Sequence, residues 1–174
     1  MSAITITRHP LPVSDEQAAG LFYVFTWRLL GEAETMIEVD KWPEADIDSV
    51  DEIAVERAVR NAESAALSLR VIAGARKRLL PPGIDLELVA AQAARQLASD
   101  MQALSDERDC LRRYLAGDSR YGFGMHGGDT DSEATYRGQI ATWERNVAAC
   151  RVALDFATDA LTGVDGVSAL AVAA

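Results

Sequence analysis

Hydrophobic positions recur at steps of three and four residues through most of the chain, which is the spacing of one face of a helix. The longest unbroken run lies near the C-terminus and comprises Tyr136, Ile140, Trp143, Val147, Cys150, Leu154, Ala157 and Leu161. Its steps alternate four and three without interruption. This run therefore predicts a long last helix that packs against other helices.

The first helix is predicted to run from Asp15 to about Val39. Ser14 and Gln17 form a capping-box pattern at its start. Large apolar side chains gather early in this helix, at Leu21, Phe22, Tyr23, Val24, Phe25 and Trp27. Because such a helix is apolar nearly all round, we expect it to lie at the centre of the core or to be covered on two sides.

Two more helices are predicted in the middle of the chain. A capping box at Ser49 and Glu52 starts one near Ile47, and Pro81 stops it after Leu80. Asp85 caps the next helix, whose predicted seam is Leu86, Ala90, Ala93, Leu97, Met101, Leu104, Arg108, Leu111 and Leu115. The seam predicted for the helix from Ile47 to Leu80 is Ile47, Val50, Ala54, Ala58, Ala65, Leu69 and Ile72. Asn61 is the polar exception on that seam, and Arg108 is the exception on the seam of the next helix. Arg108 should find a carboxylate or reach the edge of the bundle, because a buried unpaired charge is costly.

Three segments lie outside this helical pattern: an extended arm (1–13), a glycine-rich loop (117–131) and an apolar tail (164–174). No change of composition marks a domain boundary, so we expect one domain over 1–174. The predicted fold is all-α: an antiparallel bundle of about four long helices, with a short extended N-terminal arm and a Gly-rich loop before the last helix.

Charge and cysteine content narrow the function classes. The 174 residues include 27 acidic and 17 basic side chains, for a net charge of −10, which disfavours direct binding to a nucleic-acid backbone. Cys110 and Cys150 form no disulfide framework and are expected to be free thiols. The most apolar early stretch, Ala18 to Leu30, is too short to span a membrane. We therefore expect a cytoplasmic protein that does not bind membranes.

Catalytic and cofactor signatures are weak. Gly122 to Gly127 spells GxGxxG, but a helix precedes it instead of a strand, so no nucleotide cofactor is expected. The two histidines, His9 and His126, lie in the arm and the loop, which excludes a di-iron centre of Glu-x-x-His pairs in the bundle core. We therefore predict no catalytic residues, no metal site and no cofactor, and lean against an enzyme.

Acidic residues crowd the stretch from Glu32 to Glu56, where Lys41 is the only base. These acids extend well before the start of the second predicted helix, which a helix dipole does not require, so we predict a surface for a basic protein partner. Its expected residues are Glu38, Asp40, Glu44, Asp46 and Asp48, with Phe123 and Met125 from the glycine-rich loop.

The leading hypothesis is a non-enzymatic interaction protein: an adaptor, a chaperone-like factor or an assembly subunit, with homo-oligomerisation left open. Its N-terminal arm could add a strand to a neighbour. A first alternative is a small-molecule-binding or enzymatic bundle, whose anionic ligand would lie near the loop against Arg108, Arg112, Tyr121 and His126. A second alternative is an acidic mimic of nucleic acid that inhibits a basic partner.

Overall fold

The computed structural model describes the backbone of residues 7–39, 52–121 and 132–172, and the side chains of 7–31, 59–118, 120–121 and 132–163. Four helices dominate it: α1 (Asp15–Val39), α2 (Glu52–Arg76), α3 (Leu86–Leu115) and α4 (Ser132–Val172). Two short strands, β1 (Leu11–Pro12) and β2 (Leu79–Leu80), pair antiparallel, and a 3₁₀ turn, η2 (Ser119–Tyr121), follows α3. The predicted all-α fold of four packed helices is confirmed.

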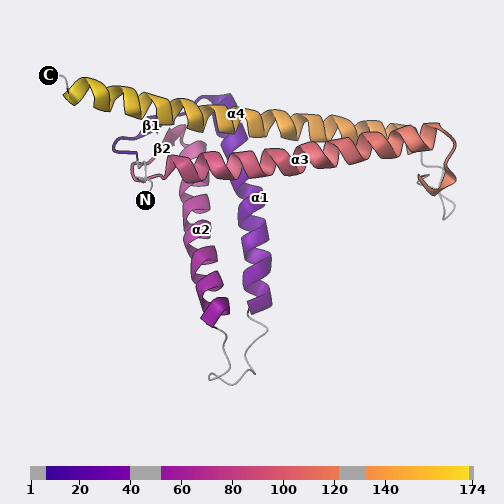
Figure 1. The fold of residues 1–174 in the computed structure, drawn as a ribbon, viewed down its shortest axis with the longest axis horizontal. Coiled ribbons are helices and arrows are strands. Elements are labelled where there is room, and N and C mark those ends of the chain that lie inside the picture. Colours follow the sequence, from indigo (N-terminus) through magenta and orange to yellow (C-terminus); the bar gives the residue numbers. More distant parts are fainter. Residues whose placement is uncertain (1–6, 40–51, 122–131, 173–174) are drawn as a thin grey trace.

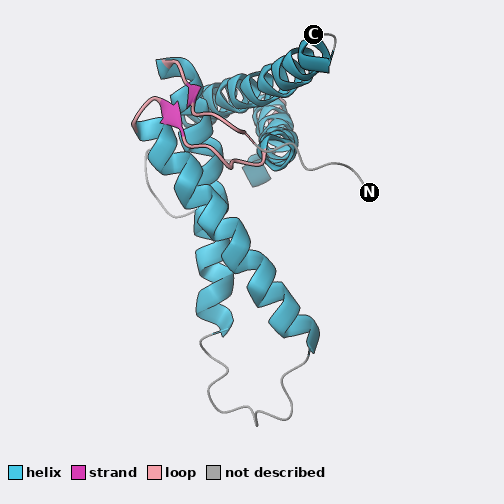
Figure 2. Cartoon of the chain, turned by 90° about the vertical axis from the view of Figure 1, so that its left-hand side faces the viewer, coloured by secondary structure: helices cyan, strands magenta, loops and turns pink. Residues whose placement is uncertain are grey.

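The helices form two antiparallel hairpins that cross each other (Figure 1). α3 and α4 lie side by side along the long axis of the molecule, and α1 and α2 stand across them (Figures 1 and 2). The core lies where the two hairpins meet. The outer half of each hairpin extends beyond this junction (Figure 1).

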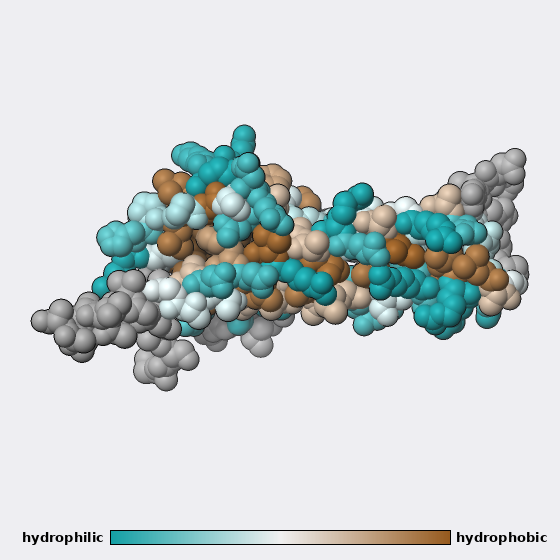
Figure 3. Space-filling view, turned by 90° about the horizontal axis from the view of Figure 1, so that it is seen from above, coloured by the Kyte–Doolittle hydropathy of each residue, from teal (hydrophilic) through white to brown (hydrophobic). Residues whose placement is uncertain are grey.

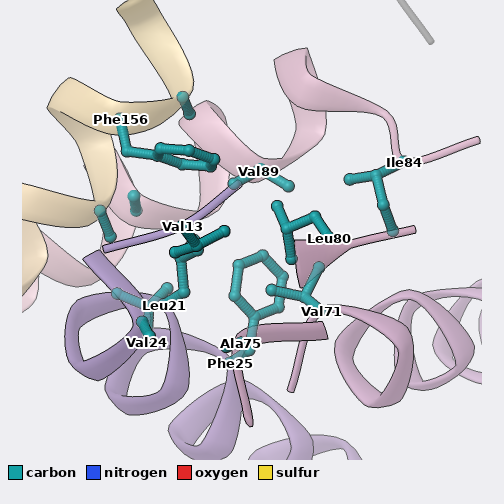
Figure 4. Packing of buried hydrophobic residues seen from close by; sticks show 14 of the residues in the cluster. Val13, Leu21, Val24, Phe25, Val71, Ala75, Leu80, Ile84, Val89 and Phe156 are labelled. Carbon is teal, nitrogen blue, oxygen red and sulfur yellow. The ribbon is translucent and has the colours of Figure 1, made fainter. Parts of the chain in front are cut away.

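The core is built from residues of all four helices (Figure 4). From α1, Leu21, Val24 and Phe25 are fully buried and meet Val71 of α2 and Val89 of α3 in one cluster. The central position expected for the first helix is therefore confirmed.

The outer side of α1 nevertheless stays open to solvent. Phe22 is 44% exposed and Trp27 is 52% exposed. The helix is therefore central, as expected, although the apolar side chains on this side of it are not covered.

The predicted helix starts agree with the structure where they can be compared. The backbone amide of Ser14 donates to Oε1 of Gln17 (2.9 Å), and the amide of Gln17 donates to Oγ of Ser14 (3.2 Å), which completes the capping box. Asp85 caps α3 by accepting from the backbone amide of Leu88 (3.0 Å). Ser49 lies outside the described residues, and α2 is described from Glu52 onward.

The C-terminal end of α2 differs from the prediction. The helix stops at Arg76 instead of Leu80. Arg78 adopts a left-handed conformation (φ 57°), which turns the chain so that Leu79 and Leu80 pair with β1. Leu80 becomes fully buried in this way, so tertiary burial overrides the local preference for one more helical turn.

The described part of the N-terminal arm is held by its own chain. Thr7 donates its amide to the carbonyl of Ile84 (3.0 Å) and accepts from the amide of Gly83 (2.7 Å). The backbone of Thr7 therefore bonds within the chain. The hypothesis that the arm adds a strand to a neighbouring molecule stays a prediction for the remaining residues. Residues 1–6 lie outside the described part.

The seam predicted for α4 agrees with the structure, and the seam predicted for α3 agrees only in part. Every position of the α4 seam is buried or half-buried, as predicted. On α3, Met101 (48%) and Leu115 (57%) belong to the predicted seam but are exposed. Gln92 and Asp100 do not belong to that seam but are buried. The reason is that α1 crosses the first half of α3 and covers a second face of it, which a single seam does not predict.

Candidate functional site

Asp100 is the one acidic or basic residue that is buried in the described part of the chain, and it forms a polar cluster at the crossing of the hairpins. Its side chain is 2% exposed. One carboxylate oxygen accepts from the hydroxyl of Tyr23 (2.9 Å) and from Sγ of Cys150 (3.3 Å), and the other accepts from Nε2 of Gln96 (2.9 Å). The cluster therefore links α1, α3 and α4 through three hydrogen bonds to one carboxylate.

The ionisation of this cluster favours a structural role. Burial raises the pKa of the Cys150 thiol to about 12, and the hydrogen bond to Asp100 adds to the effect. Burial and the same carboxylate also raise the pKa of Tyr23. Both donors stay protonated at neutral pH, so the Cys150 thiol is not a ready nucleophile.

A second polar link joins α1 to α2 and α3. The guanidinium of Arg28 donates to Oγ of Ser64 and to Oε1 of Gln92. Ser64 and Gln92 are both buried. The one charged residue in the apolar stretch of α1 therefore points toward the interior of the molecule and leaves the opposite side of the helix without charge.

Sequence reasoning did not find these two clusters. The available signal was the spacing of Gln92, Gln96 and Asp100, which recur every four residues on one face of α3. A polar stripe of that kind is normally read as a solvated face, so only the crossing of α1 shows that it is buried.

The outward side of α1 carries an apolar surface, which we call the α1 face; its residues are Ala19, Phe22, Tyr23, Thr26, Trp27 and Leu30. A groove of about 360 Å³ lies along it, with Asp15, Arg76 and Arg78 at one end, where Arg78 pairs with Asp15. Phe22, Trp27 and Leu30 are each between 44% and 52% exposed. The buried hydroxyl of Thr26 has no hydrogen-bond partner among the described residues.

The outer half of the α3–α4 hairpin carries a second hollow of about 520 Å³. We call it the arginine groove; its lining residues are Met101, Leu104, Ser105, Arg108, Arg112, Glu144, Val147, Ala148 and Arg151. Seen from above, hydrophobic residues of this hairpin lie between rows of hydrophilic ones (Figure 3).

Arg108 and Arg112, two of the predicted ligand-binding residues, come together in the arginine groove. Arg108 pairs with Glu144 of α4 (2.7 Å) and is 54% exposed, so it both finds a carboxylate and reaches the edge of the bundle. Arg112 pairs with Asp109 (2.6 Å). Arg151, which the sequence did not single out, lies in the same groove without a polar partner in the part of the chain that the structure describes.

Tyr121, the third predicted ligand residue, lies apart from that groove at the tip of the hairpin. Its hydroxyl accepts from Nη1 of Arg113 (2.9 Å), whose guanidinium stands 5.4 Å from the centre of the Tyr121 ring. Its carbonyl accepts from the hydroxyl of Tyr136 (2.7 Å). Tyr121 therefore holds the end of α3 against the start of α4.

The other predicted site residues cannot be placed. Glu38 falls within the backbone of α1, but its side chain is outside the described part. The remaining ones lie outside the described residues altogether: Asp40, Glu44, Asp46, Asp48, Phe123, Met125 and His126.

Cys110 and Cys150 are both free thiols, as predicted. Within the described ranges, no three histidine, cysteine or acidic side chains gather closely enough to hold a metal ion. None of the helices, over their described residues, is long and apolar enough to cross a membrane. Comparison of the chain with protein-family models, curated proteins and solved structures finds no match.

Proposed function

We propose that this chain is a non-enzymatic protein-interaction factor, such as an adaptor or an assembly subunit, that binds an amphipathic helix of a partner protein along the α1 face. The observation that carries the proposal is an apolar helix face that the rest of the described chain leaves uncovered. Phe22 and Trp27 are about half exposed at the middle of this helix.

The α1 face is unusual for a surface that meets solvent. Between Ala18 and Leu30 the sequence holds one charge, Arg28, and that side chain bonds to Ser64 and Gln92 away from this face. A helix without a charged side is normally buried. The small side chain of Ala19 deepens the groove between Phe22 and Tyr23, and a large apolar side chain of a partner helix would fit there.

Charge defines the expected partner further. α1 continues after Leu30 into Glu32, Glu34 and Glu38, and the acidic stretch of the sequence follows. We therefore expect basic residues at the end of the partner helix that meets this part of α1. Apolar contact would supply most of the affinity, and the charges would set the orientation and the rate of association.

Selection from a display library of helical peptides tests the proposal. Ala19→Lys places a charge in the groove, and Ala98→Lys makes the same change at an exposed position of α3. Selected peptides should carry large apolar residues at helical spacing with a basic end. They should bind the Ala98→Lys variant like the wild type and bind the Ala19→Lys variant at least roughly ten-fold more weakly. Equal binding to both variants would refute the proposal.

A second candidate function is binding of an anionic small molecule in the arginine groove. The observation that favours it is Arg151, a guanidinium without a polar partner among the described residues, next to Arg108 and Arg112. Thermal-shift measurements with organic phosphates and carboxylates test it, because a ligand of the folded state raises the melting temperature. The shift should disappear in Arg151→Gln, and no shift with any anion would count against this function.

The expected location is the cytoplasm. Two free thiols, one of them in the core, fit a reducing compartment.

A further inference from the structure

A second uncovered surface runs along α2, on the side opposite to its core. We call it the α2 stripe; its residues are Val59, Ala62, Ala66, Leu69 and Ala73, and all five are exposed. They follow steps of three and four along the helix, which is the pattern of a coiled-coil seam. Val59 and Leu69 are each 54% exposed, so the stripe contains large apolar side chains as well as alanines.

The core side of α2 is a separate stripe. Ser64, Ser68, Val71 and Ala75 are buried against the rest of the chain. Helical spacing puts these residues on the opposite face from Ala62, Ala66 and Ala73. The α2 stripe is therefore an additional apolar face and not the visible margin of the core.

Charged residues flank the α2 stripe in a definite order. Glu56, Glu63, Arg70 and Lys77 follow one another at intervals of seven, so that acids come first and bases last. Glu63 and Arg70 are exposed within α2, and Lys77 follows the last helical residue. Nη2 of Arg70 donates to the carbonyl of Pro82 (2.8 Å), and this exposed contact leaves the other guanidinium nitrogens for a carboxylate of a second copy. Residues seven apart occupy the same side of a coiled-coil seam.

We propose that the α2 stripe binds the α2 stripe of a second copy of this chain in antiparallel orientation. In an antiparallel coiled coil the same flank of each helix faces its counterpart with the direction reversed. When Ala66 lies against Leu69 of the second copy, Ala62 lies against Ala73. Glu63 then comes beside Arg70 of the second copy, and by symmetry Arg70 comes beside its Glu63.

Both the packing and the charges select this arrangement. The alanines let the two helices approach closely. The pairing also removes Val59 and Leu69, each 54% exposed, from contact with water. In a parallel pairing Glu63 and Arg70 would instead face Ala58 and Ala65 of the second copy, so neither ion pair would form. The order of charges along α2 therefore favours the antiparallel orientation over the parallel one.

This self-association does not depend on the proposed function. It uses the outward side of α2, whereas the partner helix is expected on α1. A dimer of this kind would carry two copies of the α1 face.

Sedimentation equilibrium with charge-swap variants tests the pairing. The wild type should dimerise, and Glu63→Arg should weaken the dimer roughly ten-fold, because it sets Arg against Arg70 at two symmetric places. The double variant Glu63→Arg/Arg70→Glu should restore the dimer, because it reverses both charges. High salt should reduce the difference between the single variant and the wild type.

Replacing one of two exposed alanines by lysine tests whether the α2 stripe, and not another surface, forms the dimer. Ala66→Lys should abolish the dimer, whereas Ala98→Lys on α3 should leave it intact. Circular dichroism should show unchanged helix content for every variant, because all the substituted positions are exposed. The pairing is overturned if the wild type stays monomeric at roughly 100 µM. It is also overturned if the double variant associates no better than Glu63→Arg.

Discussion

Replacing Gly20 by alanine should loosen the junction between the two hairpins. Gly20 is buried in α1 where this helix crosses α4. A Cβ atom at this position would lie 2.5 Å from the carbonyl oxygen of Ala149 and 3.2 Å from the backbone nitrogen of Ala153. Because both atoms belong to the backbone, the contact can be relieved only if one helix moves away from the other.

Two opposing effects decide the magnitude. Alanine favours helix over glycine by about 1 kcal/mol. Forcing an extra carbon atom into a packed contact costs about 1–3 kcal/mol, and a contact with backbone lies toward the upper end because no side chain can rotate away. The expected net loss is about 1–2 kcal/mol, which corresponds to a fall in Tm of roughly 2–8 °C for a chain of this length.

Urea unfolding followed by circular dichroism measures this loss. Gly138→Ala in α4 is the matched control, because Gly138 is exposed and a Cβ there would meet no atom of the described residues within 4 Å. This control should stabilise the protein by up to about 1 kcal/mol through helix propensity alone. If Gly20→Ala stabilised the protein as much as Gly138→Ala, the close approach of α1 to α4 would be wrong.

Further predictions concern the core and the Asp100 cluster. Phe25→Ala should cost about 3–5 kcal/mol in urea unfolding, because the ring is fully buried, and a loss under about 1 kcal/mol would contradict that burial. Asp100→Ala leaves three donors without an acceptor and should lower the free energy of unfolding by roughly 3 kcal/mol. Asp100→Asn keeps an acceptor and should lower it less. Equal losses for the two variants in urea unfolding would refute the hydrogen-bond account. The pKa of Cys150 rises from 9.0 to about 12 on folding, so its stabilising effect is complete below pH 9 and is lost as the pH rises toward 12. The raised pKa of Tyr23 acts in the same direction, and Tm should therefore fall from about pH 9 upward, by less in Cys150→Ala than in the wild type. An aromatic disulfide reagent should modify half-buried Cys110 at least roughly ten-fold faster than buried Cys150, and equal rates would count against the burial of Cys150.

Local sequence signals identified the helices well. The capping residues Ser14, Gln17 and Asp85 act on backbone amides within one turn, so their effect does not depend on the rest of the fold. The seam of α4 was also readable, because a long neighbour covers the same face along its described length. The position of Arg108 at the edge of the bundle was also predictable from the sequence, because its charge restricts it to a carboxylate or to solvent.

The candidate surfaces were harder to predict. The arginine groove combines two predicted residues with Arg151, which no motif marks, because the groove forms only where α3 and α4 pack. The openness of Phe22 and Trp27 depends on which side of α1 its neighbours cover. The gathering of large apolar residues in this part of the predicted helix had placed both residues in the core.

The number of helices, the starts of α1 and α3 and the regular face of α4 follow from the order of residues alone, because capping and helical spacing are local. The crossing of the hairpins does not. It buries Gln92 and Asp100, ends α2 at Arg76 so that Leu80 can pack, and leaves one side of α1 and one side of α2 uncovered. These outcomes depend on which faces of distant segments meet, since a side chain is buried by its neighbours in space and not by its neighbours in sequence.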